Sequence, residues 1–281
     1  MLKIGVVGTG HLGKIHLQNC LELTNAFEVI GFYDINPETR AQVAQQFQLK
    51  SFEQMSELLL EVDSVIIASS TSAHYALAVQ AMKHGKHVFI EKPVCLTSEE
   101  SKKLLTYSQE AGVIVQVGHV ERFNPAFTTA LPQIQHPFFM ETKRCAPFQS
   151  RGTDVSVILD LMIHDIDLVM KMSKAGVRKI GAAGYNMKSL NTDVALLRME
   201  LDNGCMAHLS ANRVSDEASR MTRVFEKDYY IEIDYLLHQV RKVTPRLNQE
   251  ALVEHIDVPK TNAIVEELTA FVNTIENGGK V

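Results

Sequence analysis

Three glycines, Gly8-x-Gly10-x-x-Gly13, stand near the start of the chain with the spacing of a phosphate-binding turn. An apolar stretch precedes them and an amphipathic helical pattern begins inside them, which is the setting in which this spacing is meaningful. The first glycine permits a tight turn, the second lets a pyrophosphate approach the backbone, and the third lets helix and strand pack closely. The N–H groups at the start of the helix favour an anion. The loop predicted to hold a dinucleotide also contains Thr9, His11 and Leu12.

A carboxylate follows the second predicted strand, residues 27–33. Asp34 lies 21 residues after Gly13, close to the spacing of an acid that accepts hydrogen bonds from a ribose 2′-hydroxyl. Because a carboxylate repels a 2′-phosphate and residues 35–37 supply no cation, the sequence favours NAD over NADP. Arg40 is the nearby cation that argues the other way. The alternative is a glycine turn and a surface carboxylate that bind nothing.

Residues 154–173 form a helical pattern that is apolar on most sides, so we expect this helix to be largely buried. One polar stripe interrupts it at helical spacing, made of Asp160, His164, Asp167 and Lys171. Buried ionisable groups need partners or a function. Asp160 and His164 are four residues apart and can touch, and a carboxylate fixes the orientation of an imidazole. Asp165 lies off the stripe and is expected to make structural hydrogen bonds. The alternative for His164 is a core histidine without a chemical role.

The elements that position these residues alternate strand and helix in the first half, which predicts a parallel sheet with right-handed crossovers. Ligands bind such sheets at the carboxyl ends of the strands. From about residue 177 the pattern changes to alternating strands separated by turns, typical of an antiparallel sheet. The predicted fold is an α/β Rossmann domain, residues 1–120, followed by an α+β domain, residues 121–281, with a large, mostly antiparallel open-faced sheet. We expect a last helix over residues 261–276.

Four segments together resemble the glucose–fructose oxidoreductase/inositol dehydrogenase (Gfo/Idh/MocA) family, and the resemblance covers essentially the whole chain. They are the glycine loop, Ala68-Ser69-Ser70-x-x-x-His74, Gly85-Lys86-His87-Val88-Phe89-Ile90-Glu91-Lys92-Pro93 and Arg122-Phe123-x-Pro125. The Glu-Lys-Pro step is the most specific of these motifs. Ser70 departs from the pattern, since many members carry proline there.

The resemblance implies a role for each matching residue. Lys92 would reach both the nicotinamide ribose and the substrate, and a cis peptide bond before Pro93 is expected. The D-x-x-x-H pair of the family matches Asp160 and His164, so His164 would be the acid/base and Asp160 its orienting carboxylate or a contact to a sugar hydroxyl. Further cofactor contacts are expected from Ser69, Ser70, His74 and Glu91.

Residues 118–125 and 160–167 look like the branch that resembles UDP-N-acetylglucosamine 3-dehydrogenases. This resemblance implies a nucleotide sugar as substrate, with Arg122, Asn124 and Arg151 in its binding site. Cations that suit a diphosphate also include Lys143 and Arg144. The alternatives are an inositol or free-sugar dehydrogenase of the same family, an enzyme of this fold that reduces an imine or a tetrapyrrole, and a non-catalytic NAD-binding regulatory protein.

Composition excludes several other classes. A net charge of −5 argues against sequence-independent nucleic-acid binding, and no apolar run reaches the length of a membrane span. The four cysteines are widely spaced and the chain begins without a signal-peptide pattern, so we expect reduced thiols, no metal site and a cytoplasmic location. The open sheet face needs a cover, and relatives cover it with one another. We therefore expect a homodimer or a homotetramer.

Overall fold

The structure is a computed structural model that describes residues 1–149 and 152–279. The chain forms two compact units, residues 1–118 together with residues from 264 onward, and residues 119–263. The change from one unit to the other therefore lies near the predicted residue 120. The prediction also assigned the last helix to the second domain, with residues 121–281 as one unit. The structure groups that helix with the first unit, because its apolar side chains fill the core there.

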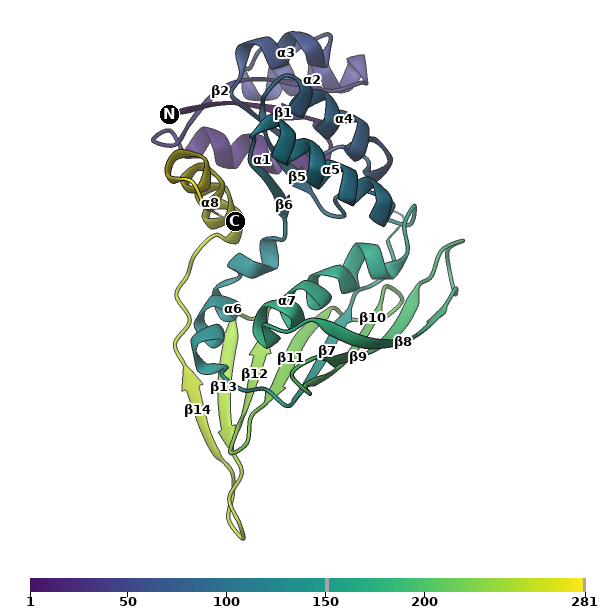
Figure 1. Cartoon of the computed structure of the whole chain (residues 1–281), viewed down its shortest axis with the longest axis vertical. Helices are drawn as coiled ribbons and strands as arrows, with labels where there is room; N and C mark the ends of the chain where they lie inside the picture. Colours follow the sequence, from purple (N-terminus) through teal and green to yellow (C-terminus); the bar gives the residue numbers. More distant parts are fainter. Residues whose placement is uncertain (150–151, 280–281) are drawn as a thin grey trace. The chain divides into compact units, whose positions relative to one another are not determined.

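The first unit contains a six-stranded sheet in which every neighbouring pair is parallel, in the order β3-β2-β1-β4-β5-β6 (Figure 1). The strands are β1 (Leu2–Val7), β2 (Phe27–Tyr33), β3 (Ser51–Phe52), β4 (Ser64–Ile67), β5 (His87–Glu91) and β6 (Val115–Gly118). The helices are α1 (His11–Glu22), α2 (Pro37–Phe47), α3 (Met55–Glu61), α4 (Thr71–Lys83), α5 (Ser98–Ala111) and α8 (Ala263–Asn277). The strand order reverses at β1 and β4, and such sheets bind ligands at this reversal.

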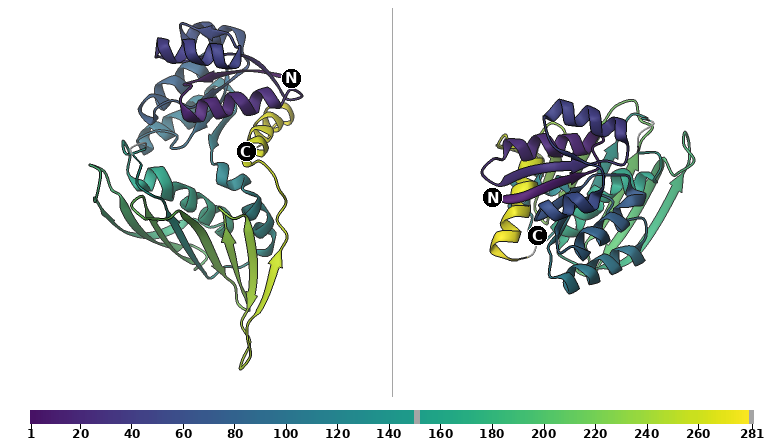
Figure 2. Two further views of the ribbon diagram at one scale, coloured as in Figure 1. Left: turned by 180° about the vertical axis from the view of Figure 1, so that it is seen from behind. Right: turned by 90° about the horizontal axis from the view of Figure 1, so that it is seen from above.

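Each face of this sheet is covered by helices, as the two further views show (Figure 2). The strand side chains alternate between the faces, so Val6 packs with the side chains of α1 and α8 while Val7 packs with those of α3, α4 and α5. In α8, Phe271 meets Phe89 of β5 edge to face, with ring centroids 5.9 Å apart. The chain's last helix thus completes a core begun by its first strand.

The second unit contains an eight-stranded sheet in the order β14-β13-β12-β11-β7-β10-β9-β8. The β7–β10 pair is parallel and the other pairs are antiparallel, which confirms the predicted mostly antiparallel sheet. The strands are β7 (Phe139–Cys145), β8 (Val177–Tyr185), β9 (Val194–Leu201), β10 (Met206–Asn212), β11 (Ser219–Phe225), β12 (Tyr230–Asp234), β13 (Gln239–Thr244) and β14 (Leu252–Ile256). The sequence reading did not predict β14.

Helices cover one face of this second sheet (Figure 1). They are the 3-10 turns η1 (Val120–Phe123) and η2 (Leu131–Gln133), α6 (Pro125–Ala130), the π-helical turn η3 (Ile158–Met162) and α7 (Ile163–Ser173). The buried core lies between them and the strands. The opposite face is open, and all nine residues of the edge strand β8 are exposed.

Two further observations bear on the sequence predictions. Within residues 1–149 and 152–279, no helix combines the length and apolar character needed to cross a bilayer. All four cysteines of the chain are buried, free thiols.

Candidate functional site

The glycine loop joins β1 to α1, and each glycine has its own steric reason. Gly8 has φ of +86°, a backbone conformation that favours glycine. A Cβ atom on Gly13 would lie 2.0 Å from the carbonyl oxygen of Gly8, so helix and strand could not pack this closely with any other residue. A Cβ atom on Gly10 would meet no protein atom within 4 Å. The space above Gly10 is therefore left open by the protein itself.

The start of α1 is suited to an anion. Its N-cap is Gly10, no side chain caps it, and its first turn contains no acidic residue. Its free N–H groups and positive dipole end are thus not neutralised by the protein. Thr9 is buried, whereas His11 and Leu12 are exposed beside the loop. The loop has the open space and the donors that a pyrophosphate requires.

Asp34 follows β2 and is tied to the glycine loop. The backbone N–H and the hydroxyl of Thr9 both donate to its Oδ2, at 2.7 and 3.1 Å, and the N–H of Asn36 donates to Oδ1 at 2.9 Å. Arg40 donates from Nη1 to the main-chain oxygen of Asp34 at 2.7 Å. The carboxylate predicted to recognise a ribose is thus held in place by the loop predicted to bind the pyrophosphate.

The loops after β4 and β5 are linked to each other. The ring of His74 is buried, with Nε2 3.1 Å from the carbonyl oxygen of Ser69 and Nδ1 2.9 Å from that of Pro93. Ser69 is half-buried and Ser70, the N-cap of α4, is exposed. His74 therefore contacts two predicted cofactor loops through their backbones.

The Glu-Lys-Pro step ends β5. The carboxylate of Glu91 is buried and lies 2.7 Å from Nε2 of His16, a residue on the inward face of α1 that the sequence reading missed. The backbone N–H of Lys92 donates to the other oxygen of Glu91 at 3.2 Å. Lys92 is half-buried, and the expected cis peptide bond joins it to Pro93. A titratable residue among the buried positions of α1 is the signal that could have identified His16.

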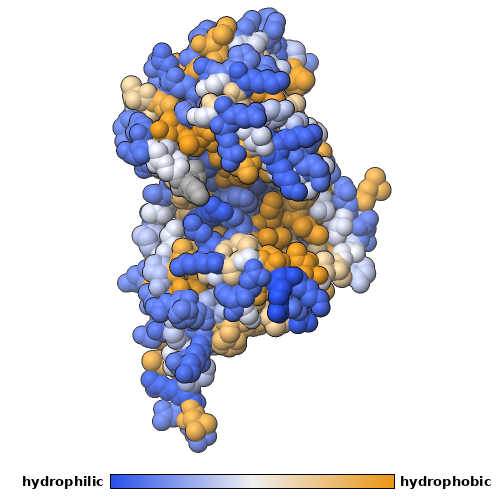
Figure 3. All heavy atoms as spheres, in the orientation of Figure 1, coloured by the Kyte–Doolittle hydropathy of each residue, from blue (hydrophilic) through white to orange (hydrophobic). Residues whose placement is uncertain are grey.

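In the second unit, the acid–base candidates lie where one helix type changes into another. Asp160 is in the π-helical turn η3, and His164 is in the first turn of α7. A π-helical turn inside a helix is uncommon and is frequent at functional sites. No residue from 155 to 170 is exposed, which confirms the prediction of a largely buried helix. The space-filling view shows apolar side chains gathered over α7 (Figure 3).

The loop before η3 lies close to the carboxylate of Asp160. Gly152 has φ of +78°, and a Cβ atom on it would lie 2.9 Å from Oδ2 of Asp160. Arg213 donates to the carbonyl oxygen of Gly152 at 2.7 Å and to the buried carboxylate of Asp193 at 2.8 Å. Although burial acts to raise the pKa of Asp193, hydrogen bonds from the N–H groups of Ser189 and Lys188 hold that pKa well below its ordinary value. This internal network holds the loop beside Asp160.

Two of the three residues predicted to bind substrate, Arg122 and Asn124, make hydrogen bonds within the second unit. Arg122 is partly exposed, and its Nε and Nη2 donate to the carboxylate of Asp167 at 2.7 and 2.6 Å. Asn124 is 7% exposed, and both its amide donor and its acceptor are used inside the unit, by Glu121, Tyr235 and the start of α6. These contacts indicate a structural role for Asn124. Arg151 lies outside the described residues.

A buried ion cluster lies beneath α7. Arg144, which the sequence reading grouped with the cations that suit a diphosphate, is 2% exposed and donates from Nε and Nη2 to Asp165 at 2.9–3.0 Å. Its Nη1 donates to Glu121 at 2.8 Å. Burial opposes the charge on Arg144, but the carboxylates of Asp165 and Glu121 outweigh that and raise its pKa. Because these nitrogens are committed internally, Arg144 is not a diphosphate ligand. The structural hydrogen bonds predicted for Asp165 are confirmed.

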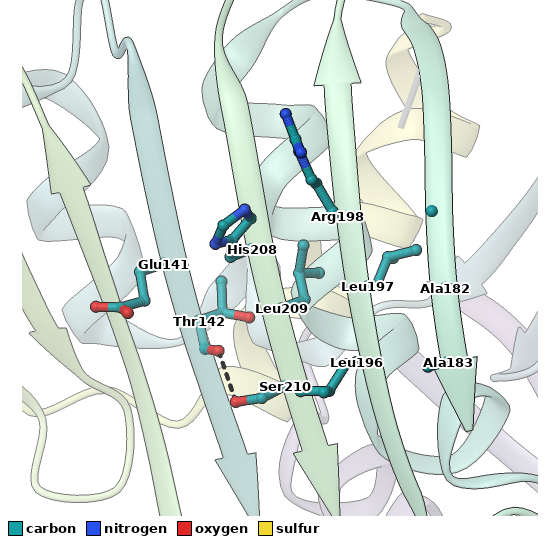
Figure 4. Close-up of a pocket in the computed structure, with 11 residues that line it drawn as sticks. Glu141, Thr142, Ala182, Ala183, Leu196, Leu197, Arg198, His208, Leu209 and Ser210 are labelled. Carbon is teal, nitrogen blue, oxygen red and sulfur yellow. Dashed lines mark hydrogen bonds between the residues drawn. The ribbon is translucent and has the colours of Figure 1, made fainter. Parts of the chain in front are cut away.

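The open face of the second sheet carries a groove of about 550 Å³, lined by residues of β7, β8, β9 and β10 (Figure 4). Small side chains of β8, Ala182 and Ala183, form one wall, and Leu196 of β9 lies beside them (Figure 4). The hydroxyl of Ser210 donates to the main-chain oxygen of Thr142 at 3.2 Å. The titratable side chains of its lining are Glu141, Arg198 and His208.

Known proteins are similar to this chain in sequence and in fold. Residues 2–119 match the family model GFO_IDH_MocA, described as an oxidoreductase family with an NAD-binding Rossmann fold. UDP-N-acetylglucosamine 3-dehydrogenase of Acidithiobacillus ferrooxidans is 36% identical to this chain over 98% of the chain and 88% of the relative. A solved structure of that enzyme aligns with this chain over 100% of this chain and 90% of the enzyme's chain, with a TM-score of 0.92 and 35% identity. A scyllo-inositol 2-dehydrogenase (NAD⁺) of Bacillus subtilis is 26% identical over 99% of the chain and 87% of the relative.

Proposed function

The chain belongs to the Gfo/Idh/MocA family of oxidoreductases, and on this basis we propose that it is an NAD-dependent dehydrogenase of a nucleotide sugar, acting on UDP-N-acetylglucosamine at C3. The observation that carries the proposal is the similarity to a dehydrogenase of that substrate over 98% of the chain. The D-x-x-x-H pair supports it, because Asp160 in η3 and His164 in the first turn of α7 are four residues apart and both half-buried.

The residues present fit a nicotinamide dinucleotide. The open space above Gly10 and the uncapped start of α1 suit its pyrophosphate, and Asp34 suits the adenosine ribose. We favour NAD over NADP because the carboxylate of Asp34 accepts hydrogen bonds from Thr9 of the glycine loop, while the guanidinium of Arg40 donates to the main-chain oxygen of Asp34. The bound cofactor supplies the hydride acceptor at nicotinamide C4.

The chain's own residues handle the proton. In the direction of alcohol oxidation, His164 accepts the proton of the sugar hydroxyl as hydride leaves the carbon that bears this hydroxyl, and Asp160 orients the imidazole. The ammonium group of Lys92 stabilises the negative charge that develops on the oxygen. In the direction of ketone reduction, His164 returns the proton. Each proton and each hydride is thus accounted for without a metal ion.

A substrate panel tests this proposal. Purified protein is assayed for NADH formation with UDP-N-acetylglucosamine, free N-acetylglucosamine and myo-inositol. We expect turnover with the nucleotide sugar and at least tenfold lower kcat/KM with the other two. Turnover confined to myo-inositol or free sugars would support the inositol dehydrogenase alternative. NADH binding without turnover of any alcohol would support a regulatory protein.

Variants identify the chemical residues. His164→Asn and Lys92→Met should each lower kcat by about 10²–10⁴-fold, the usual contribution of a positioned acid, base or charge. The dissociation constant for NADH should stay within about threefold. His255→Asn, at an exposed histidine of β14, is the matched control and should keep wild-type kcat. A His164→Asn variant with wild-type kcat contradicts the assigned role.

We propose in addition that a second copy of the chain covers the open face of the second sheet, giving a homodimer or a homotetramer. Strand β8 is exposed along all nine residues, and Leu196 beside it is 55% exposed. Such an apolar edge strand is a pairing surface that proteins ordinarily cover.

We also propose a cytoplasmic location. The four thiols are free and buried, which suits a reducing compartment.

A further inference from the structure

The cluster of Arg144, Asp165 and Glu121 is the feature of the second unit that the proposed chemistry does not use. All three side chains are buried, and Arg144 bridges the two carboxylates with hydrogen bonds of 2.8–3.0 Å. Asn124 donates to the second oxygen of Glu121 at 3.0 Å, so the cluster is satisfied. A buried ion pair ordinarily adds no stability beyond that of apolar residues of the same volume. Its presence here calls for another reason.

The place of Asp165 supplies that reason. It directly follows His164 in the first turn of α7, while Arg144 comes from β7 and Glu121 from η1. Successive residues of a helix differ by about 100° around its axis and 1.5 Å along it. Arg144 of β7 binds the carboxylate of Asp165 and is itself held by Glu121 of η1, so fixing this carboxylate fixes the direction in which His164 points.

The start of α7 lacks the usual local means of fixing itself. Its N-cap is Met162, which makes no side-chain capping bond, and the preceding turn is π-helical. A π-helical turn departs from the regular backbone ladder that sets helix rotation. Arg122 supplies a second clamp two residues after the first, through both oxygens of Asp167. The rotation of this helix is thus set by arginines from outside it.

We propose that Arg144 and Asp165 are positioning residues, which hold the imidazole of His164 in its productive orientation without touching the substrate. This inference rests on the proposed function, in which His164 is the acid/base. It predicts that the ion pair matters for turnover far more than for folding.

The test replaces both charges at once. In Arg144→Met/Asp165→Leu the carboxylate of Glu121 loses Arg144 but keeps Nη1 of Arg220 at 3.2 Å and the amide of Asn124 at 3.0 Å. No charge of the cluster is then left buried without a partner, so the protein should fold with a melting temperature near that of the wild type. A displacement of about 1 Å at a reacting group costs about 10²-fold in rate. We expect kcat to fall about 100-fold, with NADH affinity within threefold. The primary deuterium isotope effect on kcat, measured with substrate deuterated at the reacting carbon, should rise as the chemical step becomes rate-limiting.

Tyr235→Phe is the matched control. The hydroxyl of Tyr235 donates to Thr222 at 3.0 Å in the same core, and its ring lies 5.9 Å from the guanidinium of Arg144. Removing the hydroxyl should lower stability, because the Thr222 oxygen loses its partner, but kcat and the isotope effect should not change. Tyr235→Phe should therefore lower stability but not turnover, whereas the double variant should lower turnover but not stability.

Three outcomes are distinct. If the folded double variant keeps wild-type kcat and isotope effect, the inference is wrong. If the double variant does not fold, Asp165→Asn keeps the volume and one acceptor, and the same fall in kcat and rise in isotope effect are required of it. If the wild type turns over none of the sugars, the proposed function fails and this inference fails with it.

Discussion

Two alanine substitutions in the glycine loop should have opposite effects, because the structure gives their Cβ atoms opposite surroundings. At Gly10 the added atom meets no protein atom within 4 Å, and the backbone there, with φ of −64°, is open to other residues. At Gly13 it lies 2.0 Å from the carbonyl oxygen of Gly8. Gly10→Ala should therefore weaken binding of the ligand, and Gly13→Ala should lower the stability of the fold.

The magnitudes follow from these contacts. For Gly13→Ala, overpacking costs about 3 kcal/mol and the better helix propensity of alanine returns about 1 kcal/mol. A net loss of about 2 kcal/mol lowers the melting temperature by about 4–8 °C. For Gly10→Ala, the weaker N-cap costs up to about 1 kcal/mol and the stiffer unfolded chain offsets most of that. Its melting temperature should match the wild type within about 2 °C.

NADH binding should be weakened by Gly10→Ala, although this variant should hardly change stability. A Cβ atom on Gly10 occupies the space into which the pyrophosphate fits, and losing one charge-assisted hydrogen bond costs about 1.5–3 kcal/mol. NADH should then bind about 10- to 150-fold more weakly to a variant that is as stable as the wild type. Thermal unfolding and fluorescence titration with NADH give both quantities. Wild-type NADH affinity in Gly10→Ala would refute the assignment of this loop to the pyrophosphate.

Two further predictions concern a buried carboxylate and the open sheet face. Because the pKa of Asp193 is lowered by folding, its stabilising effect is present above the unfolded pKa of about 4 and is lost as pH falls below it. The stability difference between wild type and Asp193→Asn in urea should be about 3 kcal/mol at pH 7 and should shrink progressively below pH 4; the exposed control Asp228→Asn should show no such trend. On the groove of β8, Ala182→Arg should convert the proposed oligomer to a monomer in light scattering, with Glu53→Arg as an exposed control in the first unit. An unchanged mass for Ala182→Arg argues against the open face as the contact between copies.

Much of the cofactor half of the molecule could be predicted from sequence, because its signals are local. The glycine spacing and the acid after the second strand each act within a few positions, as does the capping box of α5, which Thr97 forms with Glu100. The parallel sheet followed from the alternation of strands and helices. The pairing of His16 with Glu91 joins residues 75 positions apart, so no local pattern could reveal it.

The second unit was predicted less completely, because its cations look alike in sequence. Arg122 and Arg144 were both assigned to a diphosphate, yet the structure buries Arg144 between two carboxylates and pairs Arg122 with Asp167. Only the fold decides which guanidinium meets an internal acid. The π-helical turn was also missed, since residues 158–162 carry the same apolar periodicity as an α-helix.

The position of α8 has a consequence for how the chain is made. On the ribosome, residues 1–118 emerge complete in sequence while the side chains of Leu268, Phe271 and Val272 have yet to be synthesised. Until those side chains are synthesised, the apolar cluster that contains Phe89 and Ile66 is incomplete. The nascent nucleotide-binding half therefore exposes apolar surface during the translation of about 150 further residues. Because α8 is synthesised last, this half is prone to aggregation until translation ends, and molecular chaperones bind exposed apolar surface of this kind.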